Sequence, residues 1–172
     1  MNNDPFDACH SFTLGQEGGY SNNPSDPGGA TMEGLTMADL WQWDRDATVA
    51  DLQNMPLALR DGIYRSFYWQ PIRGADLGPG LDLMVYDMGV NAGVGTSAKI
   101  LQRLLGVDID GCIGPLTCLA VRGVSDPALF ITRMYVAQLG VYQLMRAWPV
   151  FGNGWAARAG RRRDAAMARL PA

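Results

Sequence analysis

Apolar side chains near the start of the chain recur at a spacing typical of an α-helix. Between residues 5 and 17, Phe6, Cys9 and Thr13 would share one face of such a helix, with Asp4 placed to cap its N-terminus. Two consecutive glycines at positions 18–19 would end it, because glycine disfavours continued helix. The pattern therefore predicts a first helix over residues 5–17.

The stretch from residue 20 to residue 35 loses this periodicity. It is dense in Asn, Pro, Asp and Gly, the residues that favour turns, so we expect turns and a short hairpin here. Irregular segments carried by a helical scaffold often hold functional residues. This stretch is thus the first place to look for a site.

Helical spacing resumes after the irregular stretch and continues to the C-terminal end. The predicted helices cover residues 36–43, 48–54, 56–68, 81–93, 96–105, 115–122, 127–146 and 154–170. Segment 81–93 is apolar on nearly all sides, which predicts a buried central helix. We therefore expect a mainly α-helical fold with one short, irregular β-hairpin, built as lobes 1–93 and 94–172 that pack as one compact unit.

Composition and charge narrow the possible partners. With 172 residues, 48% of them hydrophobic, the chain can bury a core, and a folded monomer is expected. It holds no run of the roughly 18 to 20 apolar residues that cross a bilayer, so no membrane insertion is expected. The net charge of −3 argues against a broad nucleic-acid-binding surface.

The three cysteines and the single histidine do not form a pattern typical of a metal site. Cys9, Cys112 and Cys118 show no CxxC spacing, and His10 alone cannot complete a zinc ligand set. We expect free, mostly buried thiols, with a Cys112–Cys118 disulfide as the less favoured alternative, and no metal or cofactor. His10 is expected to be a buried, hydrogen-bonded side chain.

Glutamate is rare in this chain, since only Glu17 and Glu33 accompany 15 aspartates. Glu17 would lie at the C-terminal end of the first helix, where the helix dipole disfavours a carboxylate, and apolar neighbours would act in the same direction. A carboxyl group that keeps its proton near neutral pH can protonate a leaving group. Glu17 is therefore the candidate general acid.

The loop after Glu17 holds candidates for the complementary role. Glycosidic bond hydrolysis needs a second group that activates water or stabilises the developing positive charge. Asp26, in a polar loop that can fold back over Glu17, would stay ionised, and the Thr31 hydroxyl could hold the water. As alternatives, Asp26 would cap the turn at residues 27–29, and Thr31 would bond to the backbone.

Several other side chains could contact a sugar. Tyr20, Tyr68 and Trp69 offer flat apolar faces with polar edges, on which sugar rings can stack. Core packing explains Trp69 equally well. Asn91, beside glycines at the end of the apolar helix, would either bond to a sugar amide or cap that helix.

The order of short motifs along the chain resembles a known family. The matching segments are Glu17-Gly18-Gly19-Tyr20, Asp26-Pro27-Gly28-Gly29, Thr31, Gly34-Leu35-Thr36, Tyr68-Trp69-Gln70-Pro71 and Val90-Asn91-Ala92-Gly93. They closely resemble the E-G-G-Y…D-x-G-G-x-T-x-x-G-[IL]-T signature of the glycoside hydrolase family 108 muramidases. The C-terminal half, from Leu101-Gln102 to Gly154-Trp155, is similar to the peptidoglycan-binding region that accompanies that domain.

The resemblance implies a lysozyme-like helical fold that cleaves the bond between N-acetylmuramic acid and N-acetylglucosamine, with Glu17 as general acid. It also implies a substrate contact for Gln102. Glu17, Asp26 and Thr31 resemble the Glu…Asp…Thr triad of phage lysozymes, although the Asp to Thr interval is one residue shorter here. The sequence departs from the family at Met32-Glu33, which makes Glu33 a rival second carboxylate.

Other functions are compatible with the same residues. A lytic transglycosylase would use one glutamate without water, and a wall-binding module would have lost catalysis. Both retaining and inverting hydrolysis stay open, because the outcome depends on the separation of the two carboxyls.

Family members are phage endolysins or bacterial muramidases. Without a visible signal peptide, we expect synthesis in the bacterial cytoplasm and release by a holin or a secretion system to the periplasm or cell wall.

Overall fold

The computed structural model describes residues 4–22 and 29–171. Its elements, in chain order, are α1 (Pro5–Leu14), β1 (Thr31–Met32), β2 (Leu35–Thr36), α2 (Met37–Trp43), α3 (Val49–Gln53), α4 (Leu57–Tyr64), the π-helix η1 (Arg65–Trp69), the 3-10 helix η2 (Gly74–Asp76), α5 (Leu81–Ala92), α6 (Val94–Leu105), α7 (Pro115–Arg122), α8 (Pro127–Gln143) and α9 (Trp148–Met167). The predicted fold class, mainly α-helical with one short hairpin, is confirmed.

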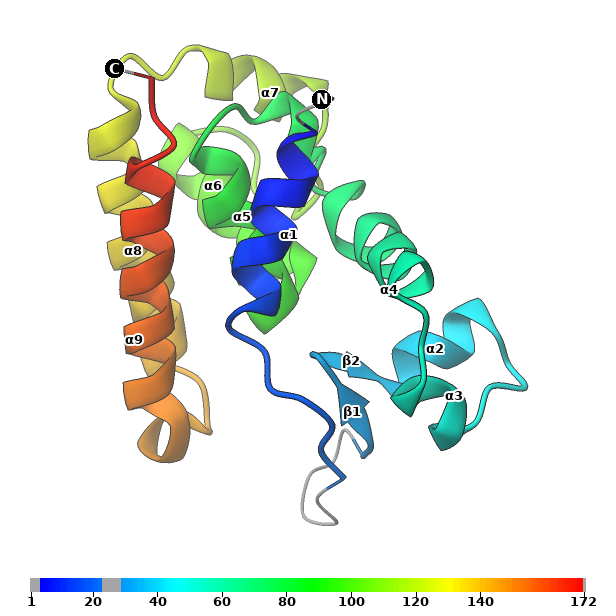
Figure 1. The fold of residues 1–172 in the computed structure, drawn as a ribbon. Coiled ribbons are helices and arrows are strands. Elements are labelled where there is room, and N and C mark those ends of the chain that lie inside the picture. Colours follow the sequence, from blue (N-terminus) through cyan, green and yellow to red (C-terminus); the bar gives the residue numbers. More distant parts are fainter. Residues whose placement is uncertain (1–3, 23–28, 172) are drawn as a thin grey trace.

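Helix α5 forms the centre of the molecule, as its apolar sequence predicts. Every residue from Leu81 to Gly89 is buried, and α1, α6, α8 and α9 all contact it. Figure 1 shows α8 and α9 running side by side on one flank, while the hairpin, α2 and α3 lie on the other flank. Helix α1 runs along α5 between these two flanks.

Helix α1 begins where its capping signals place it but ends earlier than predicted. The Asp4 carboxylate accepts a hydrogen bond from the Phe6 N–H, and Pro5 occupies the first turn. The helix ends at Leu14, and Glu17 lies in a tight turn in which its N–H donates to the Leu14 carbonyl at 3.2 Å. The tighter turn replaces the last helical residues of the prediction.

The hairpin occupies the end of the irregular segment. Thr31 pairs with Thr36 and Met32 with Leu35, leaving a two-residue turn at Glu33 and Gly34. Both turn residues have positive φ, 47° and 83°, the combination that matches the twist of a tight hairpin. The backbone of Ser21 also bridges Thr31, which holds the chain just after Glu17 against β1.

The C-terminal helices differ from the prediction in length. Helix α9 begins at Trp148, earlier than the expected residue 154, and α8 ends at Gln143 rather than 146. Pro149 fits the first turn of α9, where no hydrogen-bond donor is needed. Gly152 leaves room for the Trp148 ring, because a Cβ there would lie 2.6 Å from it. Gly152 therefore serves packing inside α9.

The structure also bears on the predictions made for the three cysteines and for membrane-spanning helices. Cys9, Cys112 and Cys118 are all free, with Cys112 exposed and the other two buried, so the alternative Cys112–Cys118 disulfide is wrong. Among the helices of the described residues, none has both the length and the apolarity needed to cross a membrane.

Candidate active site

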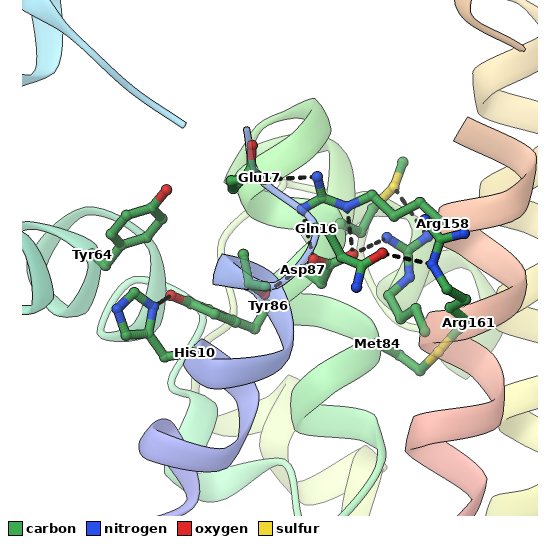
Figure 2. Close-up of polar contacts among 12 residues, drawn as sticks. His10, Gln16, Glu17, Tyr64, Met84, Tyr86, Asp87, Arg158 and Arg161 are labelled. Carbon is green, nitrogen blue, oxygen red and sulfur yellow. Dashed lines mark hydrogen bonds and ion pairs between the residues drawn. The ribbon is translucent and has the colours of Figure 1, made fainter. Parts of the chain in front are cut away.

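The carboxyl group of Glu17 lies between the hairpin turn and α9. The side chain is 17% exposed, so it is partly reachable from solvent. Two independent contacts fix it, one from each flank of the molecule, and Figure 2 shows the contact from α9. Glu17 is therefore held at the place where the two flanks approach each other.

Gly34 makes the contact on the hairpin side. A Cβ atom at this position would lie 2.9 Å from both Cδ and Oε2 of Glu17, and 2.6 Å from the hydroxyl of Tyr64. That hydroxyl donates to the backbone carbonyl of Glu33 at 2.6 Å, which fixes the turn against α4. The hairpin turn thus rests directly on the Glu17 carboxyl, and only glycine fits there.

Arg158 makes the contact on the α9 side. Its Nη1 lies 2.7 Å from Oε1 of Glu17, and its side chain is only 8% exposed. Burial by itself would lower the pKa of Arg158, but the carboxylates of Asp87 and Glu17 outweigh it and raise that pKa, so the guanidinium stays charged. The neighbour of Glu17 on this flank is a cation, not the apolar surface expected from the sequence.

Asp87 of α5 holds the arginine in turn. Its carboxylate accepts from Nε and Nη2 of Arg158 at 3.1 and 2.7 Å, from Nη1 of Arg162 at 2.8 Å, and from the Thr13 hydroxyl at 3.0 Å. Burial raises the pKa of Asp87, but the two guanidinium groups outweigh it and leave the pKa below its usual value. A charged, fully buried aspartate therefore ties α1, α5 and α9 together.

A second network of polar side chains links α4 to the hairpin. Arg60 pairs with Glu33 at 2.6 Å and with Asp61 at 2.8 Å. Asp61 also lies 3.1 Å from Nε2 of His10, whose Nδ1 is 3.0 Å from the Tyr86 hydroxyl. Both ring nitrogens of the buried His10 therefore have partners, as expected for a structural histidine.

Tyr68 lies beside Tyr64, whose hydroxyl bonds to the hairpin turn. Its ring packs against Tyr64 with centroids 5.4 Å apart. Burial, together with the negative charges of Asp39 and Glu17, raises the pKa of Tyr68 to about 12. Its hydroxyl therefore keeps its proton over the physiological range and is available as a hydrogen-bond donor.

Comparisons with known proteins match both halves of the chain. The family described as "Glycosyl hydrolase 108" matches residues 10–93, and the one described as "Predicted Peptidoglycan domain" matches residues 96–160. The solved structure of SagA from Brucella abortus is similar over 96% of this chain and 95% of its own, with 34% sequence identity and a TM-score of 0.88. The chain belongs to glycosyl hydrolase family 108. A search of curated proteins found no match.

Membership makes this protein a glycoside hydrolase that degrades peptidoglycan. Within the described ranges, no three His, Cys, Asp or Glu side chains gather in a way that would hold a metal ion.

The site residues expected for this family-108 enzyme differ in where they lie and in how exposed they are. Asp26 lies outside the described residues. Thr31 lies in β1, where its N–H and carbonyl both bond to Ser21. Tyr20 is 40% exposed on the segment that follows Glu17. Asn91 is half-buried in the last turn of α5.

Two of the expected substrate contacts are buried, and Trp69 packs as its core-packing alternative predicts. Trp69 is 4% exposed and packs in the core against Phe6 and Tyr86, so its ring is not free to stack on a sugar. Gln102 is also buried, and its amide bonds to Asp110 and to the backbone of residues 111–112. These bonds fix the loop between α6 and α7.

Glu33, the rival second carboxylate, is committed to an ion pair. Its Oε2 lies 2.6 Å from Arg60, and the side chain is 35% exposed. The contacts of Arg158 with Glu17 and Asp87 were not predicted from the sequence. The available signals were two aspartates, Asp82 and Asp87, inside an apolar helix and a pair of arginines four residues apart on α9.

Proposed function

We propose that this enzyme is a muramidase that hydrolyses the β-1,4 bond between N-acetylmuramic acid and N-acetylglucosamine, with Glu17 as its general acid. The observation that carries the proposal is the Glu17 carboxyl, partly exposed and fixed between the Gly34 turn and Arg158. A group that donates a proton must be held at a defined position relative to the bond that breaks.

In this reaction Glu17 gives its proton to the glycosidic oxygen, and the electron pair of the C1–O bond moves to that oxygen. Water adds to C1 of the muramic acid residue and loses one proton to a second carboxylate. We assign that role to Asp26, with the Thr31 hydroxyl orienting the water. The pairing of Glu33 with Arg60 favours Asp26 over Glu33.

Other residues of the enzyme would bind the glycan strand, and the chain would divide into two lobes. We propose that Tyr20, Tyr68 and Asn91 contact the glycan strand, because they are exposed or half-buried around the hairpin flank and the end of α5. We further propose a catalytic lobe, residues 1–93, and a peptidoglycan-binding lobe, residues 94–172, that act as one compact monomer. A holin or a secretion system would release the enzyme to the wall, for lysis or for remodelling.

Digestion of purified peptidoglycan tests the proposal, with wild-type protein compared with Glu17→Gln, Asp26→Asn and Glu33→Gln. We expect wild type to clear the suspension and to leave reducing N-acetylmuramic acid ends by mass spectrometry. Glu17→Gln should be inactive, Asp26→Asn strongly impaired and Glu33→Gln active.

Two results would contradict the proposal. Fragments with 1,6-anhydro ends would make the enzyme a lytic transglycosylase. Binding without cleavage by the wild type would make it a wall-binding module.

A further inference from the structure

Arg158 comes from α9, outside residues 10–93 that match the glycosyl hydrolase family, yet it bonds to Glu17. We infer that Arg158 is a positioning residue that holds Oε1 of Glu17 and thereby directs the acid proton to Oε2. The inference rests on the proposed function, because it assigns a geometry to the acid of that reaction.

The guanidinium divides its donors between two carboxylates. Nη1 reaches Glu17, while Nε and Nη2 both reach Asp87 (Figure 2). The planar group offers donors in a fixed fork, so gripping Asp87 along one edge determines where Nη1 points. The direction of the contact to Glu17 is therefore set from the core.

Asp87 cannot easily yield, because its own partners are buried. Arg162 is fully buried, and its Nη2 donates to Gln138 at 2.8 Å, whose amide donates to the Met84 carbonyl at 2.9 Å. The Thr13 hydroxyl adds a further donor to Asp87 from α1. This cluster ties the arginine to the helix that precedes Glu17 and to the centre of the fold.

The contact with Arg158 determines which oxygen of Glu17 carries the proton. Arginine has only donors, so the Glu17 oxygen that faces it must accept a hydrogen bond and cannot also present a proton in that direction. The other oxygen, Oε2, faces the hairpin turn at Gly34. The leaving oxygen of the glycan must therefore reach Oε2, and not the oxygen that faces Arg158.

The same contact stabilises the negative charge that forms on Glu17 when it gives up its proton. When the O–H bond at Oε2 breaks, the proton moves to the glycosidic oxygen and its electron pair stays on Glu17. The new carboxylate then forms beside a cation that is already in place, which lowers the cost of the charge that develops. Removing a cation next to a carboxyl group makes loss of its proton harder.

The test compares Arg158→Gln and Arg158→Lys with wild type and with Arg161→Gln as the matched control. Arg161 lies on the same helix but is exposed, and its contact is with the amide of Gln16. A soluble oligomer of alternating N-acetylglucosamine and N-acetylmuramic acid serves as substrate. For Arg158→Gln we expect kcat to fall about 100-fold or more with little change in KM. The alkaline limb of the kcat profile should move to higher pH.

Arg158→Lys keeps the charge but cannot grip both carboxylates with one ammonium group. We expect its kcat to fall as well, while its pH profile stays near that of wild type. Because it retains a cation beside Asp87, this variant also serves if Arg158→Gln does not fold, which circular dichroism and thermal unfolding would reveal. Arg161→Gln should keep wild-type kcat.

Unchanged kcat and unchanged pH profiles in folded Arg158 variants would overturn the inference. The same holds if Arg161→Gln loses as much activity as they do. A wild-type enzyme that does not release reducing muramic acid ends would instead overturn the proposed function. The two failures are therefore distinguishable in one set of assays.

Discussion

Gly34 shows how much of the site depends on a single residue. Its φ of 83° disfavours any side chain, and an added Cβ would meet the Tyr64 hydroxyl and the Glu17 carboxyl within 3 Å. The turn and the Glu17 carboxyl are thus in direct contact, so a change in one must displace the other.

We expect Gly34→Ala to lower the free energy of unfolding by about 1–3 kcal/mol, because it adds backbone strain and a steric conflict. It should also reduce kcat by roughly 100-fold, since a shift of about 1 Å at a reacting group has that effect. Denaturant unfolding and initial rates measure the two quantities. Gly62→Ala is the control, because a Cβ on that helical residue meets nothing within 4 Å. Equal behaviour of the two variants would contradict this account.

The sequence singled out Glu17 as the candidate acid but did not predict its contact with Arg158. Glu17 stood out because glutamate is rare and because two glycines and a tyrosine follow it in a family signature. Arg158 carried no such mark, since its role depends on a contact between residues far apart in the chain. The burial of Trp69 likewise depends on tertiary packing that an aromatic motif does not specify.

Among the elements, α2 illustrates how local signals fix a boundary. Thr36 and Asp39 form a reciprocal capping box, in which the Thr36 hydroxyl accepts from the Asp39 N–H and the Asp39 carboxylate accepts from the Thr36 N–H. Thr36 is also the last residue of β2, so the cap joins the hairpin to the helix.

Thr36→Ala should lower the free energy of unfolding by about 1 kcal/mol through loss of the cap. Thermal and urea denaturation would measure this. Thr132→Ala provides the comparison, because that exposed hydroxyl bonds to a carbonyl inside α8 and caps nothing, so its effect should stay within about 0.5 kcal/mol. A Thr36 variant as stable as wild type would show that the box adds nothing.

Element boundaries were the part of the fold that periodicity predicted least well. The central helix α5 was found because its apolar residues leave no polar face. The end of α1 and the start of α9 were missed, because a tight turn and an aromatic ring packed on Gly152 decide them. The change from α4 to the π-helix η1 also interrupts what the pattern predicted as one helix.

For the whole molecule, His10 connects stability to pH. Burial lowers the pKa of His10 below 6.5 despite the nearby Asp61 carboxylate. The unfolded chain therefore binds a proton in a range where the folded protein does not, so the free energy of unfolding falls as pH drops below about 6.5. His10 is the only histidine in the chain, so it is the only imidazole that can produce this dependence of stability on pH.

We expect His10→Gln to remove the change in stability between about pH 6.5 and 5, although it will lower stability at pH 7 by loss of buried contacts. Chemical denaturation of both proteins across this range measures the slope. A wild-type slope that persists in the variant would contradict the assignment. Loss of stability below about pH 4 has a separate cause, since Asp87, with its lowered pKa, must then be protonated.

The overall architecture followed from the sequence, but the connection between its two halves did not. Helical spacing and the family motifs predicted a lysozyme-like helical fold and a split near residue 93. The cluster of Asp87, Arg158 and Arg162 crosses that split and joins α5 to α9. The charges marked single positions in an apolar helix and on α9, but their pairing joins residues more than 70 positions apart, so the sequence did not predict which partners would meet.

The role of Glu17 as general acid is tested most directly by changing the leaving group. An aryl glycoside whose phenolate departs without protonation does not need the acid, whereas the natural glycan does. We predict that Glu17→Gln lowers the bond-cleavage rate on the glycan by about 100-fold to 10,000-fold and affects the aryl substrate far less. Equal losses on both substrates, or no loss on the glycan, would contradict the account.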